Sequence, residues 1–349
     1  MASTTEVAPT ATEGGRSGFL PDRIIHLHPT RLCNLACLHC YSESGPNQRG
    51  ALELGPVTSG LEVLRAEGYE VVSLPGGEPL VYRDIGAVVG AAKALGFRVT
   101  MITNGLLVGG PNAPVLAELD GMAVSFDGLA ETHDLVRGRP GAFDRACAAL
   151  RELADDGRPV AAAISLTRDA IPELPDLAYH LAELGARALQ IRPVARAGRA
   201  RSMSASAFGS DADHARLFLV AAALGQELAP DVHVHCDLAP TQGLWRERGA
   251  YAALLASCDA SGEARPLAEL VNPLVITDDG WLKPIAYDFD ARFDVAALEG
   301  LTSERLRQYK DERLPAFRHL VGSALASLED QRELVDWFDF CTRLSEAPR

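Results

Sequence analysis

Short apolar runs alternate with stretches of helical periodicity, and this alternation constrains the fold more than any other feature of the chain. The apolar runs cover residues 24–29, 71–77, 98–105, 122–128, 159–167 and 188–194. Helical periodicity follows the first five of them at residues 56–67, 84–95, 114–119, 141–156 and 172–184. Such an order predicts an α/β fold with a parallel sheet, helices outside it and right-handed crossovers. Ligands of such sheets sit at the carboxyl ends of the strands.

The sequence changes in texture after Val194. The stretch ARAGRARSMSASAFGSDAD is rich in Ala, Arg, Ser and Gly and indicates a loop or linker. Beyond it we expect a helix at 212–228, a strand at 232–235, a hairpin turning at Asp279-Gly280 and helix over 303–344. The chain is therefore expected to divide into a disordered tail at 1–18, a first domain at 19–199 and a small α+β extension at 200–349.

Composition and charge exclude several classes of protein. Of 349 residues, 47% are hydrophobic and 23% charged, which fits a globular chain. The net charge of −14 argues against a nucleic-acid partner or an anionic membrane surface. The longest strongly apolar stretch, residues 217–224, is far shorter than the ~20 residues that cross a bilayer. The first 18 residues show no secretory signal, so we expect a cytoplasmic protein.

Three of the seven cysteines stand close together in the sequence TRLCNLACLHCY. Cys33, Cys37 and Cys40 have the spacing C-x3-C-x2-C, which chance would produce only ~0.003 times in a chain of this length. In a cytosolic chain such cysteines favour metal binding over disulfides.

Two metal centres are compatible with these cysteines. Structural zinc needs a fourth ligand, which His39, His26 or His28 could supply. An iron–sulfur cubane held by three thiolates instead leaves one iron without a protein ligand, and that iron is open to chemistry.

Three further motifs each follow an apolar run. They are Gly76-Gly77-Glu78-Pro79, Thr103-Asn104-Gly105 and the segment from Ser125 to Gly128. Each is weak alone. Together with the cysteines, and in this order over residues 24–195, they resemble the radical S-adenosylmethionine (SAM) enzymes. The resemblance implies a partial (β/α)6 barrel of the TIM type, one [4Fe–4S] cluster and SAM as cofactors, and an electron donor of the flavodoxin or ferredoxin type.

The resemblance also implies roles for single residues. Cys33, Cys37 and Cys40 would bind the cluster, whose open iron takes the amino and carboxylate groups of SAM. The loop of Gly76, Gly77, Glu78 and Pro79 would receive the SAM ammonium group, because glycine permits close approach and Glu78 is an anionic acceptor.

Four more residues are expected near the cofactor. Ser125 and Arg137 match a Ser and an Arg that contact SAM, and the guanidinium would hold the methionine carboxylate. The alternative for Arg137 is a solvated residue at a helix start. Thr103 and Asn104 would point at the cofactor, although Asn104 could equally cap its turn.

Other candidates lie nearer the expected substrate. Asp127 is a candidate proton acceptor or ribose contact. Gln190 and Arg192, at the end of the sixth run, are candidates for SAM or substrate contacts, with a surface role as the alternative for Arg192. The backbone of His39 is expected to border the adenine. The alternatives of substrate contact or solvation stay open for Tyr287, Asp288 and Asp290.

The C-terminal part resembles the SPASM or twitch extension of many such enzymes. There the hairpin typically ends in a cysteine that binds an auxiliary cluster, and here Ile285 takes that place. The remaining cysteines match no cluster framework, so we expect a degenerate extension without an auxiliary cluster; they are Cys147, Cys236, Cys258 and Cys341.

The expected reaction follows from the resemblance. Reductive cleavage of SAM would give a 5′-deoxyadenosyl radical that abstracts hydrogen from the substrate, as in an oxidoreductase or lyase. The substrate class that we favour from sequence is a sugar or nucleoside intermediate of antibiotic biosynthesis, decarboxylated or dehydrogenated. The alternatives are maturation of a ribosomally made peptide, by crosslinking or epimerisation, and a metal-binding scaffold without catalysis.

Overall fold

The computed structural model describes residues 22–249, 265–329, 331 and 333–347. The expected disordered tail at residues 1–18 lies outside the described residues, and so does Cys258.

The core of the fold is a ten-stranded sheet in the order β11-β10-β9-β1-β2-β3-β4-β5-β6-β7. Strands β1 to β6 are mutually parallel, as predicted, and each pairs with the next one along the chain. Their bounds are β1 (Ile24–Leu27), β2 (Val71–Leu74), β3 (Arg98–Thr103), β4 (Gly121–Phe126), β5 (Val160–Leu166) and β6 (Ala188–Pro193). The predicted fold class, an α/β partial barrel, is confirmed.

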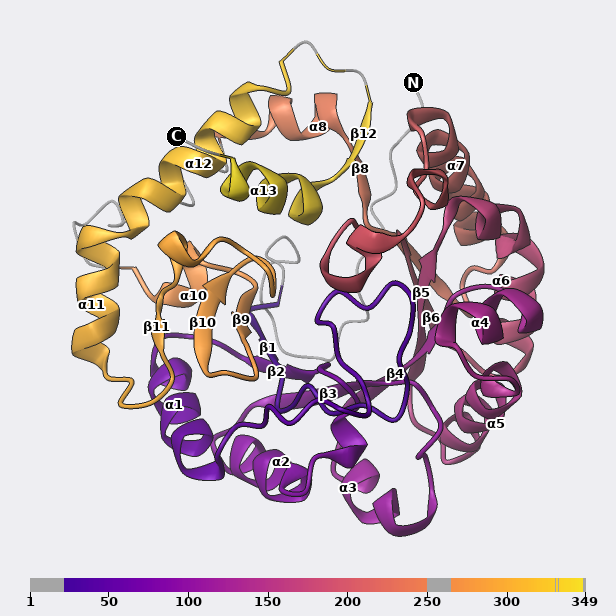
Figure 1. Cartoon of the computed structure of the whole chain (residues 1–349), viewed down its shortest axis with the longest axis horizontal. Helices are drawn as coiled ribbons and strands as arrows, with labels where there is room; N and C mark the ends of the chain where they lie inside the picture. Colours follow the sequence, from indigo (N-terminus) through magenta and orange to yellow (C-terminus); the bar gives the residue numbers. More distant parts are fainter. Residues whose placement is uncertain (1–21, 250–264, 330, 332, 348–349) are drawn as a thin grey trace.

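Helices cover the outer side of these strands, as Figure 1 shows. The five predicted ones are α1 (Leu54–Ala66), α2 (Ile85–Ala94), α3 (Ala113–Ala117), α5 (Ala142–Asp155) and α6 (Leu174–Glu183). One helix is absent from the prediction: α4 (Ala130–Arg137) precedes α5 and ends at Gly138, whose φ of 65° is left-handed. Because α4 is only eight residues long and largely polar, it offers too few apolar positions to be recognised from sequence.

The two faces of the sheet differ in burial. On β5, Val160, Ala162, Ile164 and Leu166 are buried, while the residues between them are only half-buried. Since side chains alternate between the faces of a strand, the buried set packs under the helices and the other set lines the inner side of the barrel. On β4 and β5 that inner side carries mostly small residues.

The C-terminal part extends the same sheet at both ends. After α7 (Asp211–Glu227), strand β7 (His233–Cys236) adds parallel to β6, and β9 (Leu274–Ile276) adds parallel to β1. The hairpin is completed by β10 (Trp281–Pro284), followed by β11 (Ala296–Ala297). An open sheet leaves unpaired backbone groups at its edges, and these strands satisfy them. The expected division at residues 199–200 therefore does not coincide with a break in the sheet.

The remaining elements lie between the two ends of the sheet (Figure 1). The continuous helix predicted over 303–344 is interrupted, because β12 pairs antiparallel with β8. These elements are β8 (Leu238–Pro240), α8 (Thr241–Arg246), α10 (Leu267–Leu270), α11 (Ser303–Glu312), α12 (Leu314–Ala326), β12 (Leu334–Asp336) and α13 (Trp337–Glu346). Within the described ranges, no helix combines the length and the apolar character that crossing a membrane would require.

Candidate cofactor site at the cysteine loop

The three clustered cysteines lie on the loop that follows β1, which we call the cysteine loop (residues 28–53). Cys33 and Cys37 are buried and Cys40 is half-buried. Backbone N–H groups donate to two of the sulfurs, from Leu35 to Cys33 Sγ at 3.4 Å and from Ser44 to Cys40 Sγ at 3.3 Å. Burial raises the pKa of the Cys33 thiol to about 12. The loop therefore presents protected sulfurs with amide donors aimed at them.

The loop after β2 is fastened to the cysteine loop by backbone hydrogen bonds. Gly77 N–H donates to Thr30 O at 2.9 Å, and Glu78 N–H donates to Leu32 O at 3.1 Å. A Cβ on Gly77 would come within 2.2 Å of Leu32 O. The backbone of Gly77 thus lies directly against the cysteine loop, and the predicted approach of these glycines to the SAM ammonium group stays a prediction. Pro79 then opens a short 3-10 helix, η1 (Pro79–Val81).

Glu78 connects the ends of β2 and β3. Its carboxylate is fully buried and accepts from Thr103 Oγ1 at 2.8 Å, Asn104 N at 2.9 Å and Leu80 N at 3.2 Å. Burial raises the pKa of Glu78, and these hydrogen bonds oppose the rise. Glu78 and Thr103 therefore help to hold the rim of the barrel, and their contact with SAM stays a prediction.

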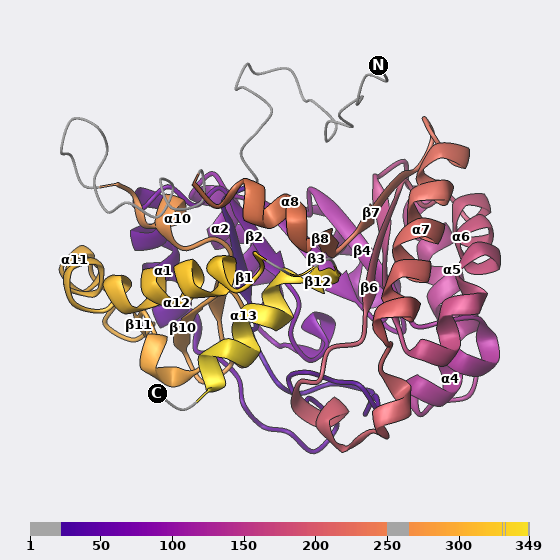
Figure 2. The same cartoon turned by 90° about the horizontal axis from the view of Figure 1, so that it is seen from above.

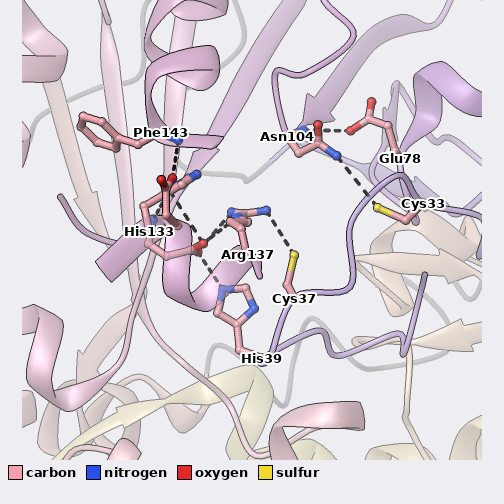
Figure 3. Close-up of polar contacts among 10 residues, drawn as sticks. Cys33, Cys37, His39, Glu78, Asn104, His133, Arg137 and Phe143 are labelled. Atoms are coloured by element: carbon pink, nitrogen blue, oxygen red, sulfur yellow. Dashed lines mark hydrogen bonds and ion pairs between the residues drawn. The ribbon is translucent and has the colours of Figure 1, made fainter. Parts of the chain in front are cut away.

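Asn104 both caps its turn and faces the cysteine loop. Its Oδ1 accepts from Leu106 N at 3.0 Å, while its Nδ2 donates to Asn34 Oδ1 at 2.7 Å. The same Nδ2 lies 3.9 Å from Cys33 Sγ, as Figure 3 shows. Capping of the turn by Asn104 is thus compatible with an orientation of its amide toward the predicted cofactor site.

Asp127 and Arg137 form a buried pair. Figure 3 shows Arg137 beside Cys37. The guanidinium donates from Nε to Oδ2 at 2.5 Å and from Nη2 to Oδ1 at 3.1 Å, and its Nη1 lies 3.9 Å from Cys37 Sγ. The alternative of a solvated arginine at a helix start is wrong: Arg137 ends α4 and is 8% exposed.

Two histidines complete the surroundings of Asp127. His39 Nε2 lies 2.7 Å from Asp127 Oδ1, and His133 Nδ1 accepts the Asp127 N–H at 3.2 Å. Burial alone would raise the pKa of Asp127, but the charges of Arg137 and His39 hold it below its ordinary value. The Asp127 carboxylate is thus ionised and bound by both side chains. The resemblance implied only a backbone role near the adenine for His39, whereas its side chain links the cysteine loop to the end of β4.

The other predicted residues lie further along the barrel. Ser125 is half-buried on the inner face of β4. Gln190 and Arg192 belong to β6, and both contact Asp237 beyond β7 rather than the pair of Asp127 and Arg137. Arg192 is 44% exposed.

Sequence reasoning missed Arg199, which lies in the stretch interpreted as a linker. Its guanidinium donates to Cys37 O and to Ser44 O, both at 2.6 Å, and its N–H donates to Cys40 O at 2.9 Å. Figure 2 shows the segment after β6 beside the cysteine loop, where the parallel strands have their carboxyl ends. No signal in one sequence reveals this clamp, because its partners are backbone carbonyls more than 150 residues away.

An aromatic cluster next to the cysteine loop was also missed in part. The rings of His28 and Tyr287 are 4.7 Å apart, and Tyr41 packs edge-on against both. Tyr287 therefore reaches the loop. In contrast, Asp288 pairs with Arg201 at 3.4 Å and Asp290 caps a short helix. Both side chains are half-buried, so the alternatives of substrate contact and solvation stay open for these two.

Three further cysteines belong to elements outside the cysteine loop. Cys341 is fully buried in α13, Cys236 is on β7, and Cys147 lies 3.6 Å from His180 Nε2. Ile285, in the place of the expected cysteine, is buried with a left-handed φ of 67°. Because Cys258 is not described, the lack of an auxiliary cluster stays a prediction.

The two metal centres differ in how closely they need their ligands to stand. Over the parts of the chain that the structure describes, no three His, Cys, Asp or Glu side chains are placed to hold one metal ion together. A cubane bridges thiolates that stand further apart than the ligands of a single zinc ion. The amide donors on Cys33 and Cys40 and the guanidinium beside Cys37 suit an anionic sulfur-bound cluster.

Comparison with known proteins agrees with this geometry. Residues 27–182 match the model of the Radical SAM superfamily. The chain thus carries a Radical SAM domain, whose cofactors are a [4Fe–4S] cluster and SAM, and the resemblance seen in the sequence is confirmed.

Two curated relatives show the range of the family. The AdoMet-dependent heme synthase of Oleidesulfovibrio alaskensis is 32% identical over 52% of this chain and 48% of its own. The antilisterial bacteriocin subtilosin biosynthesis protein AlbA of Bacillus subtilis is 28% identical over 56% of this chain and 44% of its own. The chain spans about half the length of these relatives.

A solved structure shares the fold over more of the chain. The enzyme anSMEcpe with bound AdoMet and Kp18Cys peptide has a TM-score of 0.64 and 15% identity, covering 91% of this chain and 88% of its own. At this identity the likeness shows the fold alone.

Proposed function

We propose that this protein is a radical SAM enzyme that modifies a peptide. The observation that carries the enzyme assignment is the cysteine loop itself, with three sulfurs presented together and Arg137 and Asp127 paired beside Cys37. When bound, the cluster and SAM supply a 5′-deoxyadenosyl radical able to abstract hydrogen from an unactivated C–H bond.

The chain's own residues position and shield this chemistry. Glu78 and Arg199 fasten the cysteine loop to the barrel. Arg137 places a positive charge beside the sulfur of Cys37, and Asp127 keeps that buried charge paired. The match to the Radical SAM model and the similarity to a heme synthase favour an enzyme over a scaffold protein.

The peptide class is supported by the relatives. AlbA serves the biosynthesis of a bacteriocin, and anSMEcpe was solved with a peptide bound. The sugar or nucleoside substrate favoured from sequence receives no support from these comparisons. A second candidate is a tetrapyrrole, because a relative at 32% identity is a heme synthase. The electron donor and the cytoplasmic location stay expectations.

The test is SAM cleavage by the reconstituted protein. Protein with iron and sulfide restored under anaerobic conditions is incubated with SAM and dithionite, and 5′-deoxyadenosine is measured. About four irons per chain with slow 5′-deoxyadenosine formation is the expected result. Cys37→Ala is expected to lose the bound iron and the formation of 5′-deoxyadenosine. Cys147→Ala, on the outer helix α5, is expected to keep the iron and the activity. Stoichiometric metal without any 5′-deoxyadenosine would instead support the scaffold.

A further inference from the structure

A polar group on β6, on β7 and directly after β7 has no role in the reaction described above. We call it the β6–β7 wall and define it as Gln190, Arg192, His235 and Asp237. Arg192 Nη2 lies 3.0 Å, His235 Nε2 3.2 Å and Gln190 Nε2 3.4 Å from the Asp237 carboxylate. In the sheet, Gln190 of β6 is the register partner of His235 of β7. Strand pairing and the shared Asp237 carboxylate thus hold these side chains close together.

In the β6–β7 wall the hydrogen-bond donors are exposed, whereas the accepting carboxylate is buried. The Asp237 side chain is 10% exposed, whereas those of Arg192 and His235 are 44% and 61% exposed. Burial would raise the pKa of Asp237, but the hydrogen bond from His235 and the charge of Arg192 lower it. The hydrogen bond to Asp237 in turn raises the pKa of His235. The surface offered to a ligand therefore consists of a guanidinium and an imidazole N–H.

The wall faces the same interior as the cofactor site. The charge of Arg192 acts on His26, on the inner side of β1, and on Tyr41, the neighbour of Cys40 in the cysteine loop. Strands β1 and β6 are five positions apart in the sheet, so the charge of Arg192 acts across the interior of the barrel on His26.

We propose that Arg192 and His235, oriented by Asp237, bind a carboxylate of the substrate at the β6–β7 wall. A guanidinium binds a carboxylate through paired donors. Because Asp237 holds Nε2 of His235, the Nδ1–H of the protonated imidazole adds the third donor. This proposal rests on the proposed function and refines it, since it requires a peptide with an acidic side chain. It assigns Arg192 to the substrate rather than to SAM, and Asp237 is a positioning residue.

The experiment uses two probe peptides and the reconstituted protein with SAM present. Both are capped pentapeptides of glycine and alanine, one with a central glutamate and one with a central glutamine, and binding is measured by calorimetry. The wild type should bind the glutamate peptide at least about tenfold more tightly, the value of one charge-assisted hydrogen bond. Arg192→Gln should remove this preference. The matched control is Arg196→Gln, since Arg196 stacks on Phe208 beyond β6 and should keep it.

Two variants of Asp237 distinguish loss of its positioning role from general damage to the fold. Asp237→Asn should reduce the preference between the two peptides, and Asp237→Glu, which keeps the charge, should recover it. Equal binding of both peptides by the wild type, or binding of neither, would overturn the proposal. Loss of SAM affinity in Arg192→Gln with the peptide preference intact would also overturn it.

Two controls distinguish other sources of failure. Glutarate that binds as tightly as the glutamate peptide would show that the carboxylate belongs to a small acid, which contradicts the peptide part of the proposal. Absence of 5′-deoxyadenosine in the reconstituted wild type would count against the proposed function, whatever the peptides do.

Discussion

Arg137, the last residue of α4, holds Asp127 at the end of β4 through two contacts of 2.5 and 3.1 Å. Both side chains are buried, at 9% and 1% exposure. Two of the guanidinium nitrogens are thus engaged by the protein, and only Nη1 is directed at Cys37. The pair joins a barrel strand to the cysteine loop, and any contact of Arg137 with SAM has to be made within this arrangement.

Removing the charge of Asp127 should be costly. Asp127→Asn leaves Arg137 as a buried cation without its counter-ion, and breaking such a pair costs ~3–5 kcal/mol. We expect a fall of that order in the free energy of unfolding, measured by urea denaturation of the metal-free chain, and weaker SAM binding after reconstitution. The control is Asp169→Asn, at a 75% exposed side chain, which should change stability by less than ~0.5 kcal/mol. Equal stability of the two variants would contradict the structural role of the pair.

Gly77 should tolerate no side chain. In Gly77→Ala the new Cβ meets Leu32 O at 2.2 Å, so the cysteine loop must move away from the loop after β2. We expect a loss of ~1–3 kcal/mol in unfolding free energy, as for other overpacked sites, and less iron bound per chain after desalting. Gly90→Ala on α2 is the control, because nothing lies within 4 Å of its Cβ and alanine favours a helix by ~0.5–1 kcal/mol. Full iron content in Gly77→Ala would show that the close approach is dispensable.

Arg199 should be required for retention of the cluster. Arg199→Ala removes two charge-assisted hydrogen bonds to Cys37 O and Ser44 O, each worth ~1.5–3 kcal/mol. The loop should become more mobile and lose iron faster when a chelator is added, as followed by the visible absorbance. Arg201→Ala in the same short helix (Gly198–Ser202) is the matched control, since Arg201 is 52% exposed and pairs with Asp288 and Glu346, outside the cysteine loop. Identical rates of iron loss would contradict the clamp.

Asp336 should make stability depend on pH. Burial raises its pKa to about 6, and the nearby Asp237 adds to this, against the opposing hydrogen bond from Asp339 N–H. The folded state thus binds this proton more tightly than the unfolded state, so the contribution of Asp336 to stability falls as pH rises from ~4 to ~6. Asp336→Asn, which can still cap α13, should be more stable than wild type by ~1–2 kcal/mol at pH 7.5 and equal to it near pH 4.

Denaturant unfolding of both proteins at the two pH values provides the measurement. An advantage of Asp336→Asn that is the same at both pH values would show that protonation of this carboxyl is not the cause. Asp176→Asn, in the first turn of α6, serves as the control for removal of a helix-start charge.

The sequence by itself determined the parallel sheet, because the alternation of apolar runs and helical stretches is local. Runs such as residues 71–77 and 159–167 fall on strands of the structure within a few residues. The spacing of Cys33, Cys37 and Cys40 likewise predicted a metal-binding loop, since ligands close in sequence need no knowledge of the fold. The sequence failed for α4, where the polar stretch hides the helix, and for β12, whose partner is almost 100 residues away.

Only the tertiary structure decided how the site is supported and what faces it. Arg199 donates hydrogen bonds to the backbone of the cysteine loop. Asp127 pairs with Arg137 and His39. Asp237 pairs with Arg192 and His235. These contacts join residues from different strands and loops through backbone carbonyls and single carboxylates, which leave no periodicity or spacing in the chain. The physical reason is that local propensity and pattern act over a few residues, whereas pairing of buried charges depends on which strand ends the folded sheet brings together.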